Sequence, residues 1–368
     1  MIDRLRILVL GIATRRALSD YLLGTGLILF ILASIAYTID LARWFPQIRT
    51  AAAERDVSLL SLLLPYLGQR GVDIVTRMLP VAAFFGPFIA EIARRLRLET
   101  VILATAGVSP LYTRAALMWL ALLLGLLNWG LEASWRPAAV WAQVDSGFGG
   151  YAARFRRDWV EGKWFVRGDI AIRGDVLRTD TPEMRDVLIF EGVGGGALRS
   201  IRGAERIVSV DGRYRWRMEG VTEWRSEPEA GGDRPREVEL PLVPEQLTYY
   251  GVLPYMLPTP ALNAVSDLRA RAPEAPAYAT ALWRRWTAVF LPGAIAYLAI
   301  ALANLGFEGR RALIPRLIAL GTLGYASVVT VKVFRSLGQF DILPPALSVP
   351  GSLLLLAVAA AFVARRAP

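Results

Sequence analysis

The sequence of 368 residues has no cysteine and no histidine, and only Lys163 and Lys332 among its 42 basic residues are lysines. The absence of cysteine excludes disulfides and thiolate chemistry. The absence of both residue types excludes Ser-His-Asp and Cys-His catalysis and the common zinc sites. The sequence also has no Walker A motif, which excludes ATP hydrolysis by the P-loop mechanism. We therefore predict a non-catalytic chain with no cofactor and no metal site.

The composition instead points to a membrane protein. Hydrophobic residues make up 54% of the chain, its mean hydropathy is +0.40, and its net charge is +10. Such a charge on a soluble protein would suggest a nucleic-acid partner. Here the arginines flank apolar runs, so membrane orientation explains them better than nucleic-acid binding does.

Six apolar segments are candidate membrane spans, although the second is interrupted by charges. They cover residues 17–41, 57–90, 111–131, 280–305, 313–334 and 346–363. The first is too long for a signal-peptide core, so we expect it to remain attached. The arginines that precede it and those at 94–97, 310–311 and 365–366 predict that both termini are cytoplasmic. Residues 43–56 and 335–345 then form outer loops, and Pro137 marks the outer end of the third span.

Residues 138–246 have a different pattern, with short β-rich pieces between glycine-containing turns. The pieces cover 163–167, 170–173, 186–191, 206–210, 214–218 and 237–243, and the turns lie at Gly168, Gly174, 192–196 and Asp211-Gly212. This spacing predicts a sandwich or jelly roll, with a flexible tip at 227–235. The fold class is therefore an α-helical polytopic membrane protein with six transmembrane helices and an inserted all-β, jelly-roll-like periplasmic domain. The domains are 1–137 (spans one to three), 138–258 (β domain) and 259–368 (a connecting helix and spans four to six).

The stretch from 86 to 111 has five charged residues between Glu91 and Glu99, too many for hydrocarbon. Its apolar residues keep a helical spacing from 88 to 106. Gly107 is a left-handed stop, and Ser109-Pro110 begins the next helix. One interpretation is a helix at the membrane surface that offers a rigid handle to a partner. The other is a basic loop that only fixes topology.

Two further groups of charges are open to two interpretations each. Arg70, Asp73 and Arg77 share one face of the second span. They form a self-satisfying ion ladder, or they line a cavity for an amphipathic substrate. Arg284 and Arg285 lie between two tryptophans at the outer end of the fourth span. They contact anionic headgroups or substrate, or they only extend to the interface.

Several motifs follow this layout in order: LRLETVILATAGVSP (96–110), Glu132 followed by Pro137, GDVLRTDTPEMRDVLIFE (174–191), AYATALWRR (277–285), GRRALIPRLIALGTLGYA (309–326) and DILPPAL (341–347). Together they resemble the lipopolysaccharide-export permease family, the LptF/LptG half-transporters, over nearly the whole chain. The Leu-Pro-Pro element and Asp267-Leu268-Arg269 are more similar to LptG than to LptF.

The resemblance implies an ATP-driven permease half that extracts lipopolysaccharide, or a related glycolipid, from the inner membrane and passes it through the β domain. The stretch around Glu99 becomes a coupling helix that docks on an ATPase, with Glu99 as the coupling carboxylate and Glu91, Arg95 and Arg97 beside it. Spans one and five line the lipid cavity. The implied partners are a paralogous LptF-like half-transporter, a cytoplasmic LptB-like ATPase dimer, a periplasmic bridge protein of the β-jelly-roll type and the lipid; no nucleic acid is implied.

The positions that correspond to the family's phosphate-gripping residues depart from its pattern. Tyr37 stands where LptG has a lysine late in span one, and a lysine expected early in span two falls near Asp73. The arginines expected soon after Pro137 are missing, at about Val144 and Gly147. The candidates for binding the lipid or its headgroup are the residues that this chain has near those positions or at the outer end of the fourth span: Tyr37, Arg70, Asp73, Arg77, Arg284 and Arg285.

The alternative function is a membrane-anchored scaffold or sensor whose periplasmic β domain binds a ligand. An anchor of this kind does not need charges inside a span or a structured helix near residue 99. Both hypotheses place the chain in the bacterial inner membrane.

Overall fold

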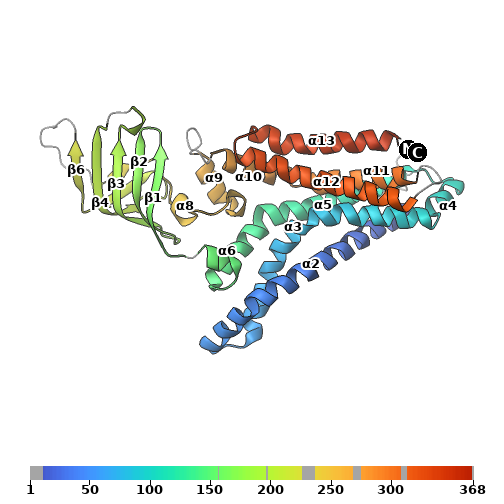
Figure 1. Cartoon of the computed structure of the whole chain (residues 1–368), viewed down its shortest axis with the longest axis horizontal. Helices are drawn as coiled ribbons and strands as arrows, with labels where there is room; N and C mark the ends of the chain where they lie inside the picture. The colour runs from blue at the N-terminus through green and yellow to red at the C-terminus, as the bar shows by residue number, and fades with distance from the viewer. Residues whose placement is uncertain are drawn as a thin grey trace. The chain divides into compact units, whose positions relative to one another are not determined.

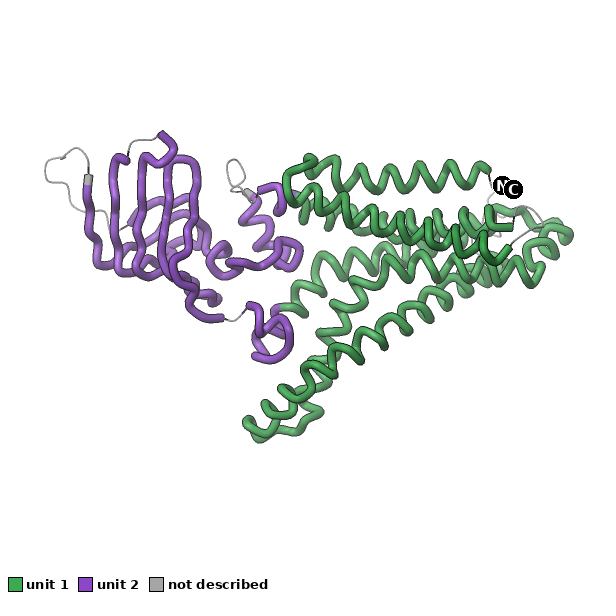
Figure 2. The backbone as a smooth tube through the Cα atoms, in the orientation of Figure 1, with its two compact units in different colours: residues 1–140, 280–368 green, residues 141–279 purple. Residues whose placement is uncertain are grey.

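The computed structural model describes residues 11–155, 157–195, 198–225, 237–267, 275–307 and 313–366. The chain divides into two compact units, one of residues 1–140 and 280–368 and the other of residues 141–279 (Figure 2). Some positions that the sequence singles out lie outside the described residues: the basic residues at 310–311, the tip at 227–235, and Leu268 and Arg269.

The first unit is a bundle of long helices (Figure 1). Its helices are α2 (Ile12–Glu54), α3 (Leu59–Leu96), α4 (Glu99–Thr105), α5 (Leu111–Gly130), the π-helical segment η1 (Leu131–Trp135), α11 (Leu291–Gly306), α12 (Leu313–Gln339) and α13 (Pro345–Arg366). Helices α6 (Arg136–Ser146) and α10 (Ala275–Thr287) begin or end in the second unit. Five helical stretches of the described chain are long and apolar enough to cross a membrane, and α10 with α11 makes a sixth if this bent pair is one span.

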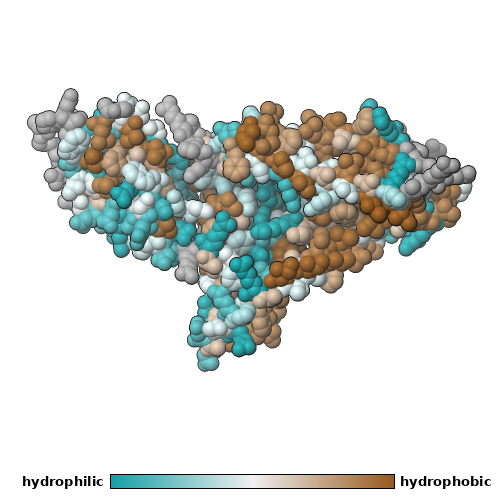
Figure 3. Space-filling view, in the orientation of Figure 1, coloured by the Kyte–Doolittle hydropathy of each residue, from teal (hydrophilic) through white to brown (hydrophobic). Residues whose placement is uncertain are grey.

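The outside of this bundle is apolar. Hydrophobic side chains cover much of its visible face (Figure 3), and Leu23, Phe30 and Ile39 on α2 are 69%, 70% and 68% exposed. Several charged side chains are buried instead, among them Asp73, Glu91 and Arg94. This reversal of the soluble pattern is what lipid as solvent demands. The predicted fold class, an α-helical membrane protein with an inserted β domain, is confirmed.

Two predicted ends of the early spans are wrong because helix continues past a proline. Residues 43–54 belong to α2, which contains Pro46, and the third span continues through Pro137 to Ser146. A proline removes the hydrogen bond to the carbonyl four residues earlier. The wider π-helical turn of η1 (Leu131–Trp135) ends two residues before Pro137, so the helical hydrogen-bonding pattern changes next to the proline.

The predicted fourth span, 280–305, is divided in two. Helices α10 and α11 meet at an angle of 64°. Pro292 lies in the first turn of α11 and cannot donate to the carbonyl of Ala288. Asn128 on α5 supplies the missing donor, with its Nδ2 2.8 Å from the Ala288 oxygen. The break is therefore satisfied inside the bundle, as an apolar environment requires. The predicted loop at 335–345 is also shorter, because α12 runs to Gln339.

The crossing of α2 over α3 depends on glycine. A Cβ atom added to Gly86 would lie 2.4 Å from the backbone N and Cα of Thr25. Backbone atoms cannot move aside as a flexible side chain can. Small residues at such crossings let two helices approach closely, which is the main source of helix association in lipid.

The second unit contains a seven-stranded antiparallel sheet with the order β1-β2-β3-β4-β5-β7, and β6 pairs with β4. The strands are β1 (Trp159–Arg167), β2 (Ile170–Leu177), β3 (Glu183–Glu191), β4 (Ser200–Ser209), β5 (Arg215–Glu219), β6 (Thr222–Arg225) and β7 (Glu237–Glu239). Short helices α7 (Gly150–Arg154), α8 (Pro244–Thr248) and α9 (Thr259–Asp267) complete the unit. One face of the sheet carries its core, around the fully buried Trp216.

The glycine turns of this unit are largely as predicted. Gly168, Gly192 and Gly212 have φ of +57°, +97° and +70°, which glycine adopts at little cost. Gly174 is not a turn: it lies within β2, where the register with β1 and β3 shifts by a bulge. Strand β6 is absent from the prediction because its four residues are too short to show an alternating pattern.

We expect Gly86→Ala to lower the thermal unfolding midpoint of the purified chain in detergent. The added methyl group meets the Thr25 backbone, and overpacking of this kind costs about 1–3 kcal/mol. Gly26→Ala is the matched control, because nothing lies within 4 Å of a Cβ added at this other helical glycine. Equal midpoints for the two variants would contradict a glycine-dependent crossing.

Candidate functional site

The predicted helix of 88–106 is two helices with a sharp bend between them. Helix α3 ends at Leu96, and Leu98 takes a left-handed conformation with φ of +59°. Such a φ is rare for leucine and ends a helix. Helix α4 (Glu99–Thr105) follows and stops before Gly107, whose φ of +76° confirms the predicted left-handed stop. Glu99 thus becomes the first residue of a separate short helix.

Arg94, near the end of α3, is the centre of a buried polar cluster. Its side chain is 2% exposed, and it lies over the rings of Tyr21 on α2 and Tyr112 on α5. Its Nη1 donates to the Tyr21 hydroxyl (2.9 Å) and to Glu91 (3.2 Å), and its Nη2 donates to the Tyr112 hydroxyl (3.0 Å). Tyr21 in turn donates to Glu91 (2.7 Å). We call these residues, with Asp20 and Glu99, the Arg94 cluster.

Glu99 joins this cluster from α4. Its carboxylate lies 3.6 Å from the Arg94 Nε and 3.2 Å from an Nη of the exposed Arg16 on α2. The structure thus places three of the four coupling candidates together, because Arg95 also lies 3.6 Å from Glu91. Arg97 is the fourth. It caps α3 and is exposed.

A second polar cluster surrounds Asp73 in the first half of α3. Asp73 is fully buried and accepts hydrogen bonds from Arg70 (2.9 Å), Arg77 (3.1 Å) and Arg136 (2.9 Å). Arg70 also donates to Asp40 on α2 (2.8 Å). We call these residues, with Tyr66, the Asp73 cluster. The contacts favour an ion ladder that joins α2, α3 and α6 over side chains that face an open cavity.

Tyr37 contributes to the same region through its hydroxyl. It donates to the Leu67 carbonyl (2.7 Å), and a Cβ atom added at Gly71 would lie 2.1 Å from it. The side chain therefore packs α2 onto α3. Tyr37 is therefore a packing residue at the position where the sequence resemblance led us to expect a lysine.

A third group, the Glu132 cluster, gathers arginines around one carboxylate. Arg284 on α10 forms an ion pair with Glu132, and Arg136 lies 3.9 Å from it. Glu132 also interacts electrostatically with Arg285 and with Arg335 on α12. The Nε of Arg335 is buried and has no hydrogen-bond partner among the described residues. Glu132 carries one negative charge beside Arg284, Arg285 and Arg335, and Arg136 also pairs with Asp73, so positive charge exceeds negative charge among these side chains.

The Arg94 and Asp73 clusters lie far apart on one continuous helix. At about 1.5 Å per residue, roughly 30 Å of α3 separates Arg94 from Asp73. This distance is close to the thickness of the hydrocarbon core, about 30 Å. The two clusters therefore fit the two faces of a bilayer.

The sheet face opposite the core of the second unit carries an apolar stripe. Val166, Ala171, Phe190, Ile201 and Trp224 pair in turn across β1, β2, β3, β4 and β6, and directly opposed residues share one face. Trp224 and Val166 are 53% and 49% exposed. The stripe is thus an apolar surface whose residues at both ends are exposed.

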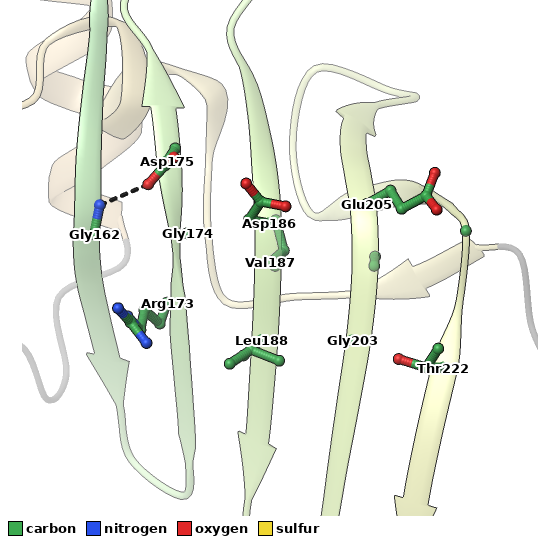
Figure 4. Close-up of a pocket in the computed structure, with 12 residues that line it drawn as sticks. Gly162, Arg173, Gly174, Asp175, Asp186, Val187, Leu188, Gly203, Glu205 and Thr222 are labelled. Carbon is green, nitrogen blue, oxygen red and sulfur yellow. Dashed lines mark hydrogen bonds between the residues drawn. The ribbon is translucent and has the colours of Figure 1, made fainter.

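Beside the stripe is a polar hollow of about 530 Å³ (Figure 4). Gly203 and Thr222 line it, and side chains from neighbouring strands surround it, among them Asp186, Glu205 and Arg173. Asp175 accepts a hydrogen bond from the Gly162 nitrogen (2.7 Å), which closes the bulge at one end. The acidic groups repel phosphate, so an anionic headgroup does not fit this hollow.

Sequence analysis missed several residues of these clusters. Tyr21, Asp40 and Tyr112 lie in apolar runs where one polar residue carries no pattern. Arg136 directly precedes Pro137, the supposed span end, and Arg335 was assigned to a loop. A tyrosine or carboxylate inside a span is a usable signal, because such a group needs an internal partner.

We expect Asp73→Asn to be severely destabilising, because it leaves three guanidinium groups around a neutral side chain. Breaking a buried ion pair costs about 3–5 kcal/mol. Arg77→Gln, at a side chain that is 45% exposed, is the milder control. Yield of monodisperse protein and the unfolding midpoint report the effect. Comparable loss in the two variants would argue against Asp73 as the centre of the cluster.

The comparison with known families agrees with this architecture. The family model described as "Lipopolysaccharide export system permease LptF/LptG" matches residues 15–366. A search of curated proteins found no match. The family match covers nearly the whole described chain, spans and β domain included, and confirms the resemblance noted in the sequence motifs. The chain therefore belongs to the LptF/LptG family of lipopolysaccharide export permeases, which are multi-pass inner-membrane proteins.

Proposed function

We propose that this chain is the LptG-like half of an ATP-driven permease that extracts lipopolysaccharide, or a related glycolipid, from the inner membrane. It pairs with an LptF-like half and an LptB-like ATPase dimer, and a jelly-roll bridge protein receives the lipid. The observation that carries the proposal is the Arg94 cluster, because it links a short surface helix to two long spans. A bare membrane anchor has no use for such a connection.

Helix α4 is suited to be the contact with the ATPase. It has no buried residue, and Val101 and Ile102 are 55% and 61% exposed. Exposed apolar residues beside charges are typical of a surface that a partner covers. Glu99 is the charged group that meets a basic residue of the ATPase, with Arg97 exposed beside it. On this assignment the Arg94 cluster and both termini are cytoplasmic.

The Glu132 cluster is the headgroup site of this proposal. Its excess of arginine suits phosphate, which guanidinium groups bind through paired hydrogen bonds. Arg284 and Arg285 are the candidates from the sequence, and the structure adds Arg335. Arg70, Asp73 and Arg77 satisfy one another and hold the helices that carry this site. Tyr37 does the same through its packing against Gly71.

The β domain lies in the periplasm and takes the lipid from the spans. Its apolar stripe supports this route, because five strands contribute one apolar residue each to a continuous surface. Acyl chains bury apolar area on such a surface at about 25 cal/mol per Å². The chain performs no covalent chemistry at any step.

We expect Glu99→Gln to leave the protein folded and inserted but to lower lipid-stimulated ATP turnover by the assembled complex about tenfold, as the loss of one charged contact does. Turnover in nanodiscs with and without lipopolysaccharide measures this. Glu54→Gln, at the end of α2, is the control carboxylate. Unchanged turnover at normal assembly would reject Glu99 as the coupling carboxylate.

We expect Trp224→Ser to reduce lipid crosslinking to a photoreactive residue at Ile201, because it removes one end of the apolar stripe. The side chain is exposed, so the sheet is expected to stay folded. Tyr214→Ser removes another exposed aromatic ring of this unit outside the stripe. If both variants crosslink lipid as the parent does, the stripe is not part of the route.

A further inference from the structure

Helix α4 is attached to the bundle at few points. None of its residues is buried, and Leu103 is the α4 residue that packs, partly buried, against the apolar core. At its other end Glu99 is the polar attachment, through Arg94 and Arg16. Arg16 is 67% exposed, so its pair with Glu99 is screened by water and weak. Arg16 donates a hydrogen bond to Glu99 (3.2 Å), whereas the contact with Arg94 is longer but buried and therefore less screened by water.

Arg94 contacts residues of four helices at once. Its two terminal nitrogens serve Tyr21 and Glu91 on one side and Tyr112 on the other. Its Nε lies between two carboxylates, 3.6 Å from Glu99 and 3.7 Å from Asp20, without a hydrogen bond to either. The guanidinium is therefore fixed by three strong contacts, and its edge toward Glu99 makes only a long one.

This arrangement lets Glu99 leave at low cost. If the carboxylate moves to another cation, Arg94 keeps Glu91 and Asp20 as counter-ions, so no buried charge is left unpaired. Removal of Arg94 itself is different, because Glu99 would keep only the exposed Arg16. Arg94 thus holds Glu99 but does not need Glu99 as its own counter-ion.

We propose that Arg94 is the positioning residue of Glu99: it holds the carboxylate, and with it α4, against α2 and α5 until a basic group of the ATPase takes the carboxylate over. This inference rests on the proposed coupling role of Glu99. Arg94 connects this carboxylate to α2 and α5, because it also binds Tyr21 and Tyr112. An equilibrium between two partners for one carboxylate is the kind of two-state element that a docking partner biases.

The test uses a charge-matched variant, Glu91→Gln with Arg94→Gln, which removes one buried charge of each sign. The chain has no cysteine, so Thr105→Cys on the exposed end of α4 gives a single position for a spin label. We expect the double variant to increase the mobility of this label in the isolated chain. We also expect it to tighten ATPase binding about fivefold or more, the lower end for coupled sites, because Arg94 no longer competes for Glu99. Arg49→Gln, at an exposed arginine near the C-terminal end of α2, should change neither.

The outcomes separate this inference from the function on which it rests. If Glu99→Gln frees the label and weakens ATPase binding but the double variant changes neither quantity, Arg94 does not position Glu99 and the coupling role stands. If Glu99→Gln alters neither ATPase binding nor turnover, the coupling role fails and the inference fails with it. When Glu99→Gln is added to the double variant, the label should gain no further mobility, because Arg94 acts through Glu99. A gain in mobility that is independent of Glu99 would show that the double variant only loosens the fold.

Discussion

A charge inside an apolar helix has to find its partner within the protein, and in this chain that constraint decides which helices meet. Asp73 binds arginines of α3 and α6, and Arg70 extends the same cluster to Asp40 on α2. Arg94 does the equivalent at the other end of α3 with Tyr21 and Tyr112. Apolar side chains gain nothing by leaving lipid for one another. These polar contacts therefore determine which helices pack together, as hydrophobic burial does in a soluble protein.

Close backbone packing then joins the helices that the charged contacts bring together. Gly86 lets α3 approach Thr25 on α2, and Gly125 on α5 admits the carbonyl of Val289 at the break between α10 and α11. The break itself costs little because Asn128 satisfies Ala288. It also turns the segment with Arg284 and Arg285 away from the axis of α11. The position of the Glu132 cluster therefore depends on a proline, a glycine and an asparagine that carry no charge.

The sequence predicted most of the architecture, because long apolar runs and short alternating strands have different periods. It also predicted Gly107 as a stop and Arg70, Asp73 and Arg77 as one face. The prediction failed where the three-dimensional structure overrides a local signal in the sequence. Pro137 predicts a helix end, but the helix continues through it after the π-helical segment η1. Leu98 has a positive φ but carries no turn signal, because leucine rarely adopts this conformation. Partners from distant segments, such as Tyr112 for Arg94 or Arg335 for Glu132, carry no pattern at all.

The position of the two clusters on α3 bears on how force could cross the membrane. A helix of this length transmits a rotation or a shift of one end to the other only if both ends are held to their neighbours, and here each end is held by a buried ion cluster. The end near α4 contains a longer contact, that of Glu99 with Arg94 at 3.6 Å, whereas all three arginines around Asp73 are at hydrogen-bond distance. Movement should therefore begin at α4 and leave the Asp73 cluster intact. Arg136 contacts both Asp73 and Glu132, so it joins the Asp73 cluster to the Glu132 cluster. The arginines of the Glu132 cluster would therefore be displaced as a group.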